Sequence, residues 1–482
     1  MEELINQLPY VYGYIITKNI MKTVKFKVLS TVLLVMLLCS SCKKDWLNAK
    51  PDKALVVPST VADYQALLDN SGEMNNQLPT LSLVGDGDYY VADATYNGLS
   101  FPQEKGAYLW AATADFYGGQ PSADWTTAYQ RILQDNVALD GLQTLKIDAS
   151  SQPAFNNVKG SALFYRSLDF YDLSQEFCKV YDTSTSGTDL GLPLRLSSNV
   201  NLTVKRASVQ QTYDQVINDL LEAAPLLPVT PLYPTRPSKP AAFGLLARIY
   251  LSQENYAKAL LYSDSCLQLQ SGLMDLNQLT PTKFTPFPQF NKEVIFHAGL
   301  SEYASAFPIG AQIVDSVLYQ SYSANDLRLS FYFIDNNDGQ GHKAFQGSYF
   351  GVAIPLFAGI ATDEMFLTRA ECYARAGNTA AALNDLNTLL QNRYITGTFT
   401  NLTASSADAA LTMILAERRK ELCFRNLRWS DLRRLNKDPR FQVTLTRIVN
   451  GQTYTLLPNS TRYILPLDPI ETTSGGLQQN PR

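Results

Sequence analysis

Two matching segments of the sequence predict the fold of this chain. The first is Leu246-Ala-Arg-Ile-Tyr-Leu-Ser-Gln-Glu-Asn-Tyr-Ala-Lys-Ala-Leu260, and the second is Arg369-Ala-Glu-Cys-Tyr-Ala-Arg-Ala-Gly-Asn-Thr-Ala-Ala-Ala-Leu383. Each reads as a helix, a short polar turn and a second helix, because apolar residues recur at helical spacing on both sides of the turn. Aligning Asn255 with Asn378 also aligns alanines and tyrosines: Ala247 with Ala370, Tyr250 with Tyr373, and Ala259 with Ala382. Small alanines let two helices approach closely, and a tyrosine fills the remaining gap.

This pattern is the helix-turn-helix arrangement of tetratricopeptide repeats. A long insertion separates the two hairpins, so no simple solenoid is expected, and two unrelated amphipathic hairpins are the alternative. Further helices are predicted after Ser59 or Thr60, from about Trp125 to Leu139, over 157–173, and after the cap Ser208. The prediction is a mainly α, single-domain fold with repeat-like helices as scaffold, long loop-rich insertions and a few short strands.

Two regions interrupt the helical pattern. Residues 71–120 and 271–360 are rich in Gly, Asn, Pro and aromatic residues, which favours loops. Short strands are expected at 294–296 and near 452–457. Because insertions between repeat units project from one face and often carry binding, ligand contacts are expected in residues 271–360.

The beginning of the chain has the pattern of a bacterial lipoprotein signal. Met21 starts a basic segment, an apolar run from Val28 to Leu38 follows, and small residues precede Cys42. We predict that residues 1–41 are upstream residues plus a signal peptide, that translation starts at Met21, and that Cys42 carries the lipid. Cys39 stands where such signals usually have Leu, and an ordinary secretory signal or a short membrane anchor is the alternative. The predicted domain is 42–482.

Composition narrows the classes of function. The net charge is −4, so the composition gives no sign of the basic surface that nucleic-acid binding needs. A hydrophobic content of 45% with 17% charged residues indicates a globular chain. There are only two histidines, so a histidine metal site or triad is poorly supplied. Spacing does not determine whether disulfides form among the four later cysteines, Cys178, Cys266, Cys372 and Cys423. Buried thiols are the simpler expectation for the last three.

The segment Glu417-Arg-Arg-Lys-Glu-Leu-Cys-Phe-Arg-Asn-Leu-Arg-Trp-Ser-Asp-Leu-Arg-Arg434 carries many charges of both signs. Glu421 and Arg425 are four residues apart and are expected to pair along a helix. The other arginines are suited to holding carboxylates or helix ends. Because acidic residues interleave with the arginines, a structural ion-pair network is favoured over a phosphate or nucleic-acid patch.

Several motifs together resemble the SusD/RagB family of outer-membrane lipoproteins. The Glu417–Arg434 segment resembles the family's Glu-Arg-Arg-x-Glu-Leu helix and Arg-Trp-x-Asp-Leu-Arg turn, and the segment from Cys42 to Pro51 resembles its mature start. The resemblance extends over the helices near Trp125, Gly160 and Gly359 and over the carboxyl end. It implies a surface lipoprotein that captures a nutrient and sits on a TonB-dependent SusC-like transporter in the outer membrane.

On this resemblance the expected ligand is an oligosaccharide or glycan. Family members that bind peptides or other nutrients leave that alternative open, and a surface glycan hydrolase is a weaker one. No catalytic motif is present, so we predict a binder and not an enzyme, with no cofactor and no metal site. The predicted ligand-binding residues are Tyr89, Tyr90, Tyr96, Trp110 and Tyr349, since sugar rings pack on aromatic faces.

The pair Asp86 and Asp88, with Gly87 between them, is the clearest candidate for paired carboxylates. Two carboxylates about 5 to 9 Å apart serve glycoside hydrolysis, and oxygen ligands of this kind also hold calcium. A solvated turn is the reading we favour for this segment.

Overall fold

Helices in the computed structural model follow one another as hairpins, and the structure describes residues 58–112, 116–300, 303 and 307–482. Residues 58–482 cluster as one compact unit. The predicted signal, the start at Met21 and the lipid site Cys42 lie outside the described residues. No helix in the described part of the chain has both the length and the hydropathy needed to span a membrane.

Both predicted hairpins are confirmed. The first joins α11 (Lys239–Ser252) to α12 (Tyr256–Leu269), and the second joins α15 (Thr362–Arg375) to α16 (Thr379–Gln391). The aligned asparagines have the same role in each, because the side chain of Asn255 accepts from Lys258 N and that of Asn378 from Ala381 N. Each asparagine is thus the N-cap that starts the second helix.

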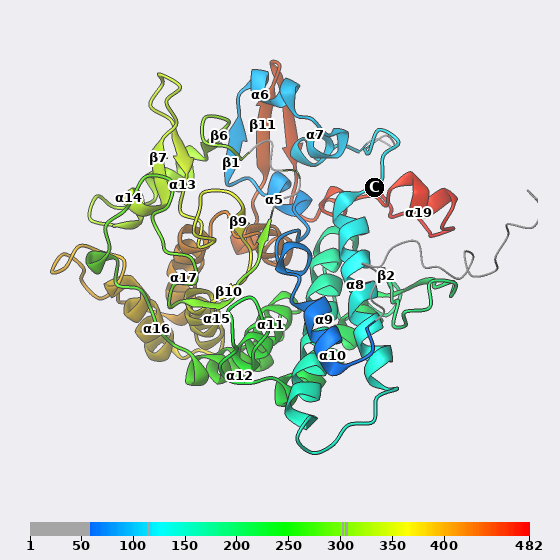
Figure 1. The fold of residues 1–482 in the computed structure, drawn as a ribbon. Helices are drawn as coiled ribbons and strands as arrows, with labels where there is room; N and C mark the ends of the chain where they lie inside the picture. Colours follow the sequence, from blue (N-terminus) through cyan, green and yellow to red (C-terminus); the bar gives the residue numbers. More distant parts are fainter. Residues whose placement is uncertain (1–57, 113–115, 301–302, 304–306) are drawn as a thin grey trace, which may run out of the picture. The chain divides into compact units, whose positions relative to one another are not determined.

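The hairpins belong to a longer succession of packed helices (Figure 1). It starts with α8 (Ala123–Leu142), α9 (Gln152–Phe177) and α10 (Val209–Leu226), where α9 packs against both neighbours. Helix α10 then packs on α11, and α12 packs directly on α15. The insertion between the hairpins therefore does not separate them, and the scaffold stays continuous.

The first helix, α3 (Val61–Leu68), begins with a capping box in which Thr60 and Asp63 satisfy each other's backbone N–H groups. The prediction of loops over 71–120 was only partly right, because four short helices form there. They are α4 (Ser71–Met74), α5 (Leu81–Gly85), α6 (Asp93–Gly98) and α7 (Pro102–Tyr108). Such short helices carry too little periodicity to be recognised in sequence. Here α5 packs on α7 and on α18 (Arg428–Leu435).

The strands in the described residues form two-stranded antiparallel sheets. The predicted strands at 294–296 and near 452–457 are confirmed. The pairs are β1 (Tyr89–Val91) with β6 (Gln312–Val314), β2 (Leu190–Pro193) with β3 (Arg206–Ser208), β4 (Val294–Phe296) with β10 (Ile360–Ala361), β5 (Gly299–Leu300) with β9 (Leu356–Phe357), β7 (Phe333–Asp335) with β8 (Lys343–Phe345), and β11 (Leu445–Val449) with β12 (Gln452–Leu456). Pairing of β4 with β10 returns the insertion to the scaffold just before α15.

The charged motif forms α17 (Ala407–Glu421), a turn and α18 (Arg428–Leu435). The predicted pair Glu421–Arg425 was wrong, because α17 ends at Glu421 and the turn leads Arg425 away from the helical position four residues on. Phe424 and Asn426 in this turn have φ of 59° and 60°. The other helices are α13 (Ser316–Gln320), α14 (Arg328–Tyr332), α19 (Pro469–Thr473) and 3₁₀ turns at Leu276–Gln278, Pro439–Phe441 and Thr461–Tyr463.

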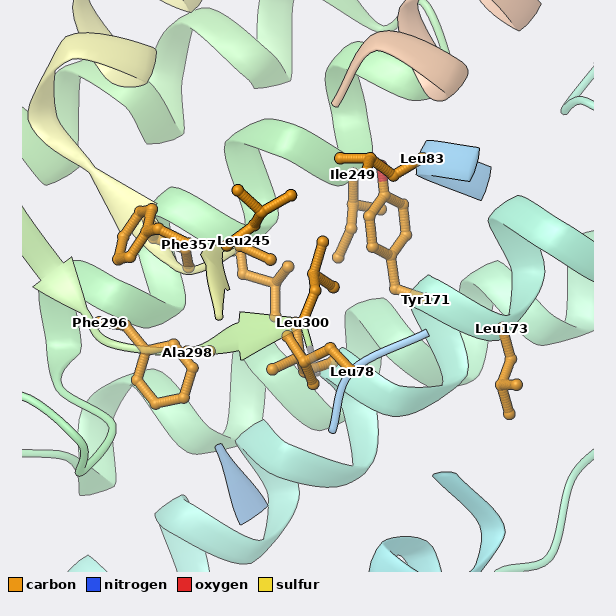
Figure 2. Packing of buried hydrophobic residues seen from close by; sticks show 14 of the residues in the cluster. Leu78, Leu83, Tyr171, Leu173, Leu245, Ile249, Phe296, Ala298, Leu300 and Phe357 are labelled. Carbon is orange, nitrogen blue, oxygen red and sulfur yellow. The ribbon is translucent and has the colours of Figure 1, made fainter. Parts of the chain in front are cut away.

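The main core joins the early helices to the repeat scaffold. Figure 2 shows Leu83 of α5 and Tyr171 of α9 near Leu245 and Ile249 of α11, with Phe296 and Phe357 from the small strands beside them. A separate cluster fills the space between α15, α16 and α17. The core therefore holds the loop-rich regions in fixed positions against the scaffold.

Candidate functional site

Three of the aromatic residues predicted to bind ligand lie inside the protein. Tyr89 and Trp110 are each 2% exposed, and together with Tyr108 they surround the guanidinium of Arg447 from β11. That group lies 3.7 Å from the ring centre of Tyr108 and 4.8 Å from that of Trp110, and it donates to Val84 O at 3.1 Å. The rings thus stabilise an internal cation through their π faces.

Tyr349 is fully buried in the insertion. Its hydroxyl donates to Glu293 Oε2 at 2.9 Å, and the guanidinium of Arg425 lies 3.8 Å from its ring centre. Its ring is therefore occupied on the side where a sugar would stack, and it links the insertion to the charged motif.

Tyr90 and Tyr96 keep partly exposed side chains. The Tyr90 ring lies edge-on to His342 at 6.1 Å, and His342 Nδ1 is 2.5 Å from Asp338. Tyr96 lies in α6, next to Asn97, whose amide exchanges hydrogen bonds with that of Asn450. Burial raises the pKa of both tyrosines, so their hydroxyls stay neutral and able to donate. Aromatic faces beside amides are the groups that a sugar needs.

A cleft that the sequence did not predict lies along α8. Its volume is about 560 Å³, within the range of small-molecule sites. One wall is α8, where the rings of Trp125 and Tyr129 lie 4.8 Å apart with their planes tilted by 41°. The other walls are the segment 193–204 and the region of α19. Arg195 and Glu471 lie on these other walls.

The signal for this cleft was present in the sequence but ambiguous. Trp125 and Tyr129 stand on the apolar stripe of α8, which is equally the pattern of a core helix. The exposed apolar residues Val200 and Leu202 line the same cleft from the segment 193–204. Only folding brings this segment next to the apolar face of α8.

The paired carboxylates Asp86 and Asp88 are both buried, so the solvated turn we favoured was wrong. Asp88 Oδ1 lies 3.2 Å from Arg419 Nε and 4.0 Å from Arg428 Nε. Burial and the charge of Asp88 raise the pKa of Asp86 well above its ordinary value. Guanidinium groups thus supply the positive charge that calcium would bring, and the one small cavity that Asp88 lines, of about 10 Å³, is shared with Arg419 and Arg428.

The predicted ion-pair network is confirmed, with different partners for Glu421. Arg328 and Arg393 hold its carboxylate at 2.8 and 2.7 Å, and Arg425 instead contacts Asp363 at 2.8 Å. Burial alone would raise the pKa of Glu421, but the charges of Arg393 and Arg328 outweigh it and lower that pKa to about 2. Other pairs are Arg418–Asp431 and Arg434–Glu371, and Arg433 donates to Gln175 O and Cys178 O at the end of α9.

Glu293, Asp363 and Glu421 form an acidic group whose oxygens lie within 4.8 Å of one another. Such a cluster could hold a metal ion in isolation, but Arg393 bridges two of its members and Arg425 holds the third. These arginines balance the charge, so the group is a structural network.

The four later cysteines are buried free thiols, and His297 is a core residue. His297 packs among Phe290, Phe350 and Phe357, and burial lowers its pKa to about 4.

Comparison with known families shows two matches along the chain. Residues 45–251 match the family described as starch-binding and associating with the outer membrane, and residues 362–463 match the SusD family. The chain belongs to the SusD/RagB family. Within it, the two matches take in the helices from α3 to α11 and the segment from α15 to the turn at Tyr463, which includes the charged motif.

Solved SusD-like structures share the fold. A putative sugar binding protein from Bacteroides vulgatus superposes with a TM-score of 0.68 at 22% identity, over 88% of this chain and 99% of that one. A SusD superfamily protein from Bacteroides thetaiotaomicron gives 0.67 at 21% identity over 88% and 100%, and a SusD-like carbohydrate binding protein from Bacteroides vulgatus gives 0.64 at 21% over 87% and 97%. No curated protein sequence matches the chain.

Proposed function

We propose that this SusD-family protein is a lipoprotein anchored through Cys42 at the cell surface. There it captures an oligosaccharide or glycan and delivers it to a partner TonB-dependent SusC-like transporter of the outer membrane. The family description, starch-binding and associating with the outer membrane, supports this proposal. So do structural neighbours described as sugar or carbohydrate binding proteins.

The observation that carries glycan binding is that Tyr90 and Tyr96 keep partly exposed rings. Tyr90 lies edge-on to His342, and Tyr96 precedes Asn97, whose amide exchanges hydrogen bonds with that of Asn450. The C–H face of a sugar packs on such a ring, and amides meet its hydroxyls. We therefore place ligand contact at Tyr90 and Tyr96, and assign Tyr89, Trp110 and Tyr349 to packing.

Titration calorimetry with a panel of glycans and peptides tests this proposal. Tyr90→Ala and Tyr96→Ala should each weaken glycan binding by roughly tenfold, since one stacked ring contributes about 1 to 2 kcal/mol. Leu202→Asp, which changes the exposed wall of the α8 cleft, is the matched control and should bind glycan normally. Loss of binding in the control alone would move the site to the cleft.

The α8 cleft keeps the peptide alternative open, because Arg195 and Glu471 on its walls offer charges of both signs to a peptide. Binding of peptides but no glycan, abolished by Leu202→Asp, would establish that alternative.

The hydrolase alternative is tested by release of reducing sugar from the same glycans. We expect none above background. Turnover that is lost in Asp86→Asn would instead show that this buried carboxylate becomes accessible and catalytic.

Anchoring and partnership need experiments in cells. Labelled fatty acid should be incorporated into the wild-type protein and not into Cys42→Ala, and a large barrel protein should co-purify with the anchored form. Binding of glycan without such a barrel partner would limit the function to capture.

A further inference from the structure

A small cavity lies where the first turn of α18 meets α5, α9 and α11. Its volume is about 20 Å³, more than the roughly 10 to 15 Å³ that one water-sized occupant needs. The residues that decide its chemistry are Ser82, Tyr171, Asp172, Arg248, Arg425 and Trp429. In Figure 2 the ring of Tyr171 extends from α9 toward Leu83, the neighbour of Ser82 in α5.

Three of the residues that line this cavity each carry a buried hydrogen-bond donor that has no acceptor among the described residues. The donors are Trp429 Nε1, Arg425 Nη2 and the hydroxyl of Tyr171. The exposed fractions of these side chains are 2%, 6% and 3%. An unsatisfied buried donor costs about 1 to 3 kcal/mol, so three around one space indicate a missing acceptor.

The helix itself adds donors at the same place. No side chain caps α18, and its first backbone bond runs from Asp431 N to Leu427 O. The N–H groups before Asp431 therefore have no partner within the helix, and the positive end of the helix dipole lies there. Leu427, Trp429 and Ser430 from this first turn all line the cavity.

Charges around the cavity also favour an anion. Arg425 pairs with Asp363 through Nη1 only, which leaves Nη2 for the cavity, and Arg248 is held by Glu364 at 2.7 Å. Among the described residues that line the cavity, Asp172 is the only one with a carboxylate, and its charge opposes an anion. Burial raises its pKa to about 7, against the charge of Arg248, so its negative charge is incomplete at neutral pH.

We propose that this cavity binds a single small monovalent anion of chloride size. The anion accepts hydrogen bonds from Trp429 Nε1, Arg425 Nη2 and the Tyr171 hydroxyl, and it neutralises the first turn of α18. It thereby ties the turn after α17 to α9 and α5, which joins the carboxyl-terminal motif to the amino-terminal helices.

The experiment uses the mature chain crystallised in sodium bromide, whose anomalous scattering distinguishes bromide from water. We expect one anomalous peak within hydrogen-bonding distance of Trp429 Nε1. A water at that position without an anomalous signal would overturn the proposal.

Thermal unfolding in sodium chloride, compared with sodium gluconate at equal ionic strength, gives the affinity. Gluconate is too large for the cavity, so the unfolding temperature should rise only with chloride, because the anion binds the folded state. Trp429→Phe keeps the ring and removes the donor, and should weaken chloride binding roughly tenfold, the factor for one hydrogen bond to a charged group. Asp172→Asn removes the opposing charge and should bind chloride more tightly.

Trp110→Phe is the matched control, because Trp110 is not among the described residues that line this cavity and its Nε1 donates to Gly85 O at a distance of 2.9 Å. It should lower stability without changing the chloride dependence. An identical chloride dependence in wild type, Trp429→Phe and Asp172→Asn would contradict the assignment even if all variants fold.

Discussion

Replacement of Arg393 by methionine tests the buried ion-pair network most directly. Arg393 is fully buried and joins two fully buried carboxylates, with Nε 2.7 Å from Glu421 and Nη2 2.9 Å from Glu293. Its third nitrogen donates to Met274 O at 2.8 Å. Methionine retains an apolar stem of similar length, so the substitution removes the charge and its hydrogen bonds with little loss of packing.

The expected loss is about 3 to 5 kcal/mol in the free energy of unfolding, the range for removing one partner of a buried pair. Glu421 keeps Arg328 at 2.8 Å and Glu293 keeps the Tyr349 hydroxyl at 2.9 Å, so we expect the lower half of that range. With a urea dependence of about 3 kcal/mol per molar, the midpoint should fall by about 1 M.

Urea unfolding followed by circular dichroism measures this shift at pH 7 and at pH 5. Arg440→Met is the control, because Arg440 pairs with Asp408 and Asp438 on an exposed surface, where such pairs contribute little. Equal midpoints for Arg393→Met and Arg440→Met would show that the buried network stabilises the fold no more than exposed ion pairs do.

The pH dependence supplies a second readout. In wild type the pKa of Glu421 is lowered to about 2, so its contribution to stability is present above the unfolded value of about 4.3 and is lost as pH falls through 2. Without Arg393, less positive charge opposes the burial of Glu421, so the pKa of Glu421 should rise and the carboxylate should take up a proton more readily. The penalty of Arg393→Met should therefore be smaller at pH 5 than at pH 7.

Three further predictions concern packing, pH and thiols. Gly141→Ala should cost about 1 to 3 kcal/mol in urea unfolding, because the new methyl group would stand 2.1 Å from the Tyr64 hydroxyl, whereas Gly98→Ala has nothing within 4 Å and should be neutral or stabilising. Because the pKa of Asp172 is raised to about 7, this carboxyl keeps its proton to higher pH in the folded state than in the unfolded chain. The free energy of unfolding should therefore fall as pH rises from about 4 to 7. Thermal unfolding across this range should show a smaller fall for Asp172→Asn. In a chain starting at Lys43, a thiol reagent should label no cysteine in the native state and all four in denaturant, since burial raises the thiol pKa values and blocks access; the residues are Cys178, Cys266, Cys372 and Cys423.

Much of the scaffold could be predicted from sequence because its signals are local. Helical spacing, the caps Thr60 and Ser208, and the paired asparagines Asn255 and Asn378 act within a few residues of where they stand. The short helices between residues 71 and 108 were missed because their stability comes from distant contacts.

The candidate site was predicted less well, because exposure is not a local property. Tyr89 and Tyr90 are neighbours in one strand, yet Tyr89 packs under Arg447 and Tyr90 faces outward. Successive side chains of a strand point to opposite faces, so Tyr89 and Tyr90 must differ in their surroundings. Which of the two faces meets the core depends on β11, more than 350 positions later in the chain.

The helical scaffold and the family follow from the sequence, since both depend on spacing and short motifs, and the lipid site at Cys42 is predicted from the same kind of signal. Tertiary structure alone decided which aromatics remain available, which arginine meets which carboxylate, and where unsatisfied donors gather. The turn after α17 illustrates the reason: it directs Arg425 away from Glu421 toward Asp363 and presents the bare end of α18 to a cavity built by three other helices. Partners of this kind are chosen by the packing of segments far apart in the chain, which no local pattern encodes.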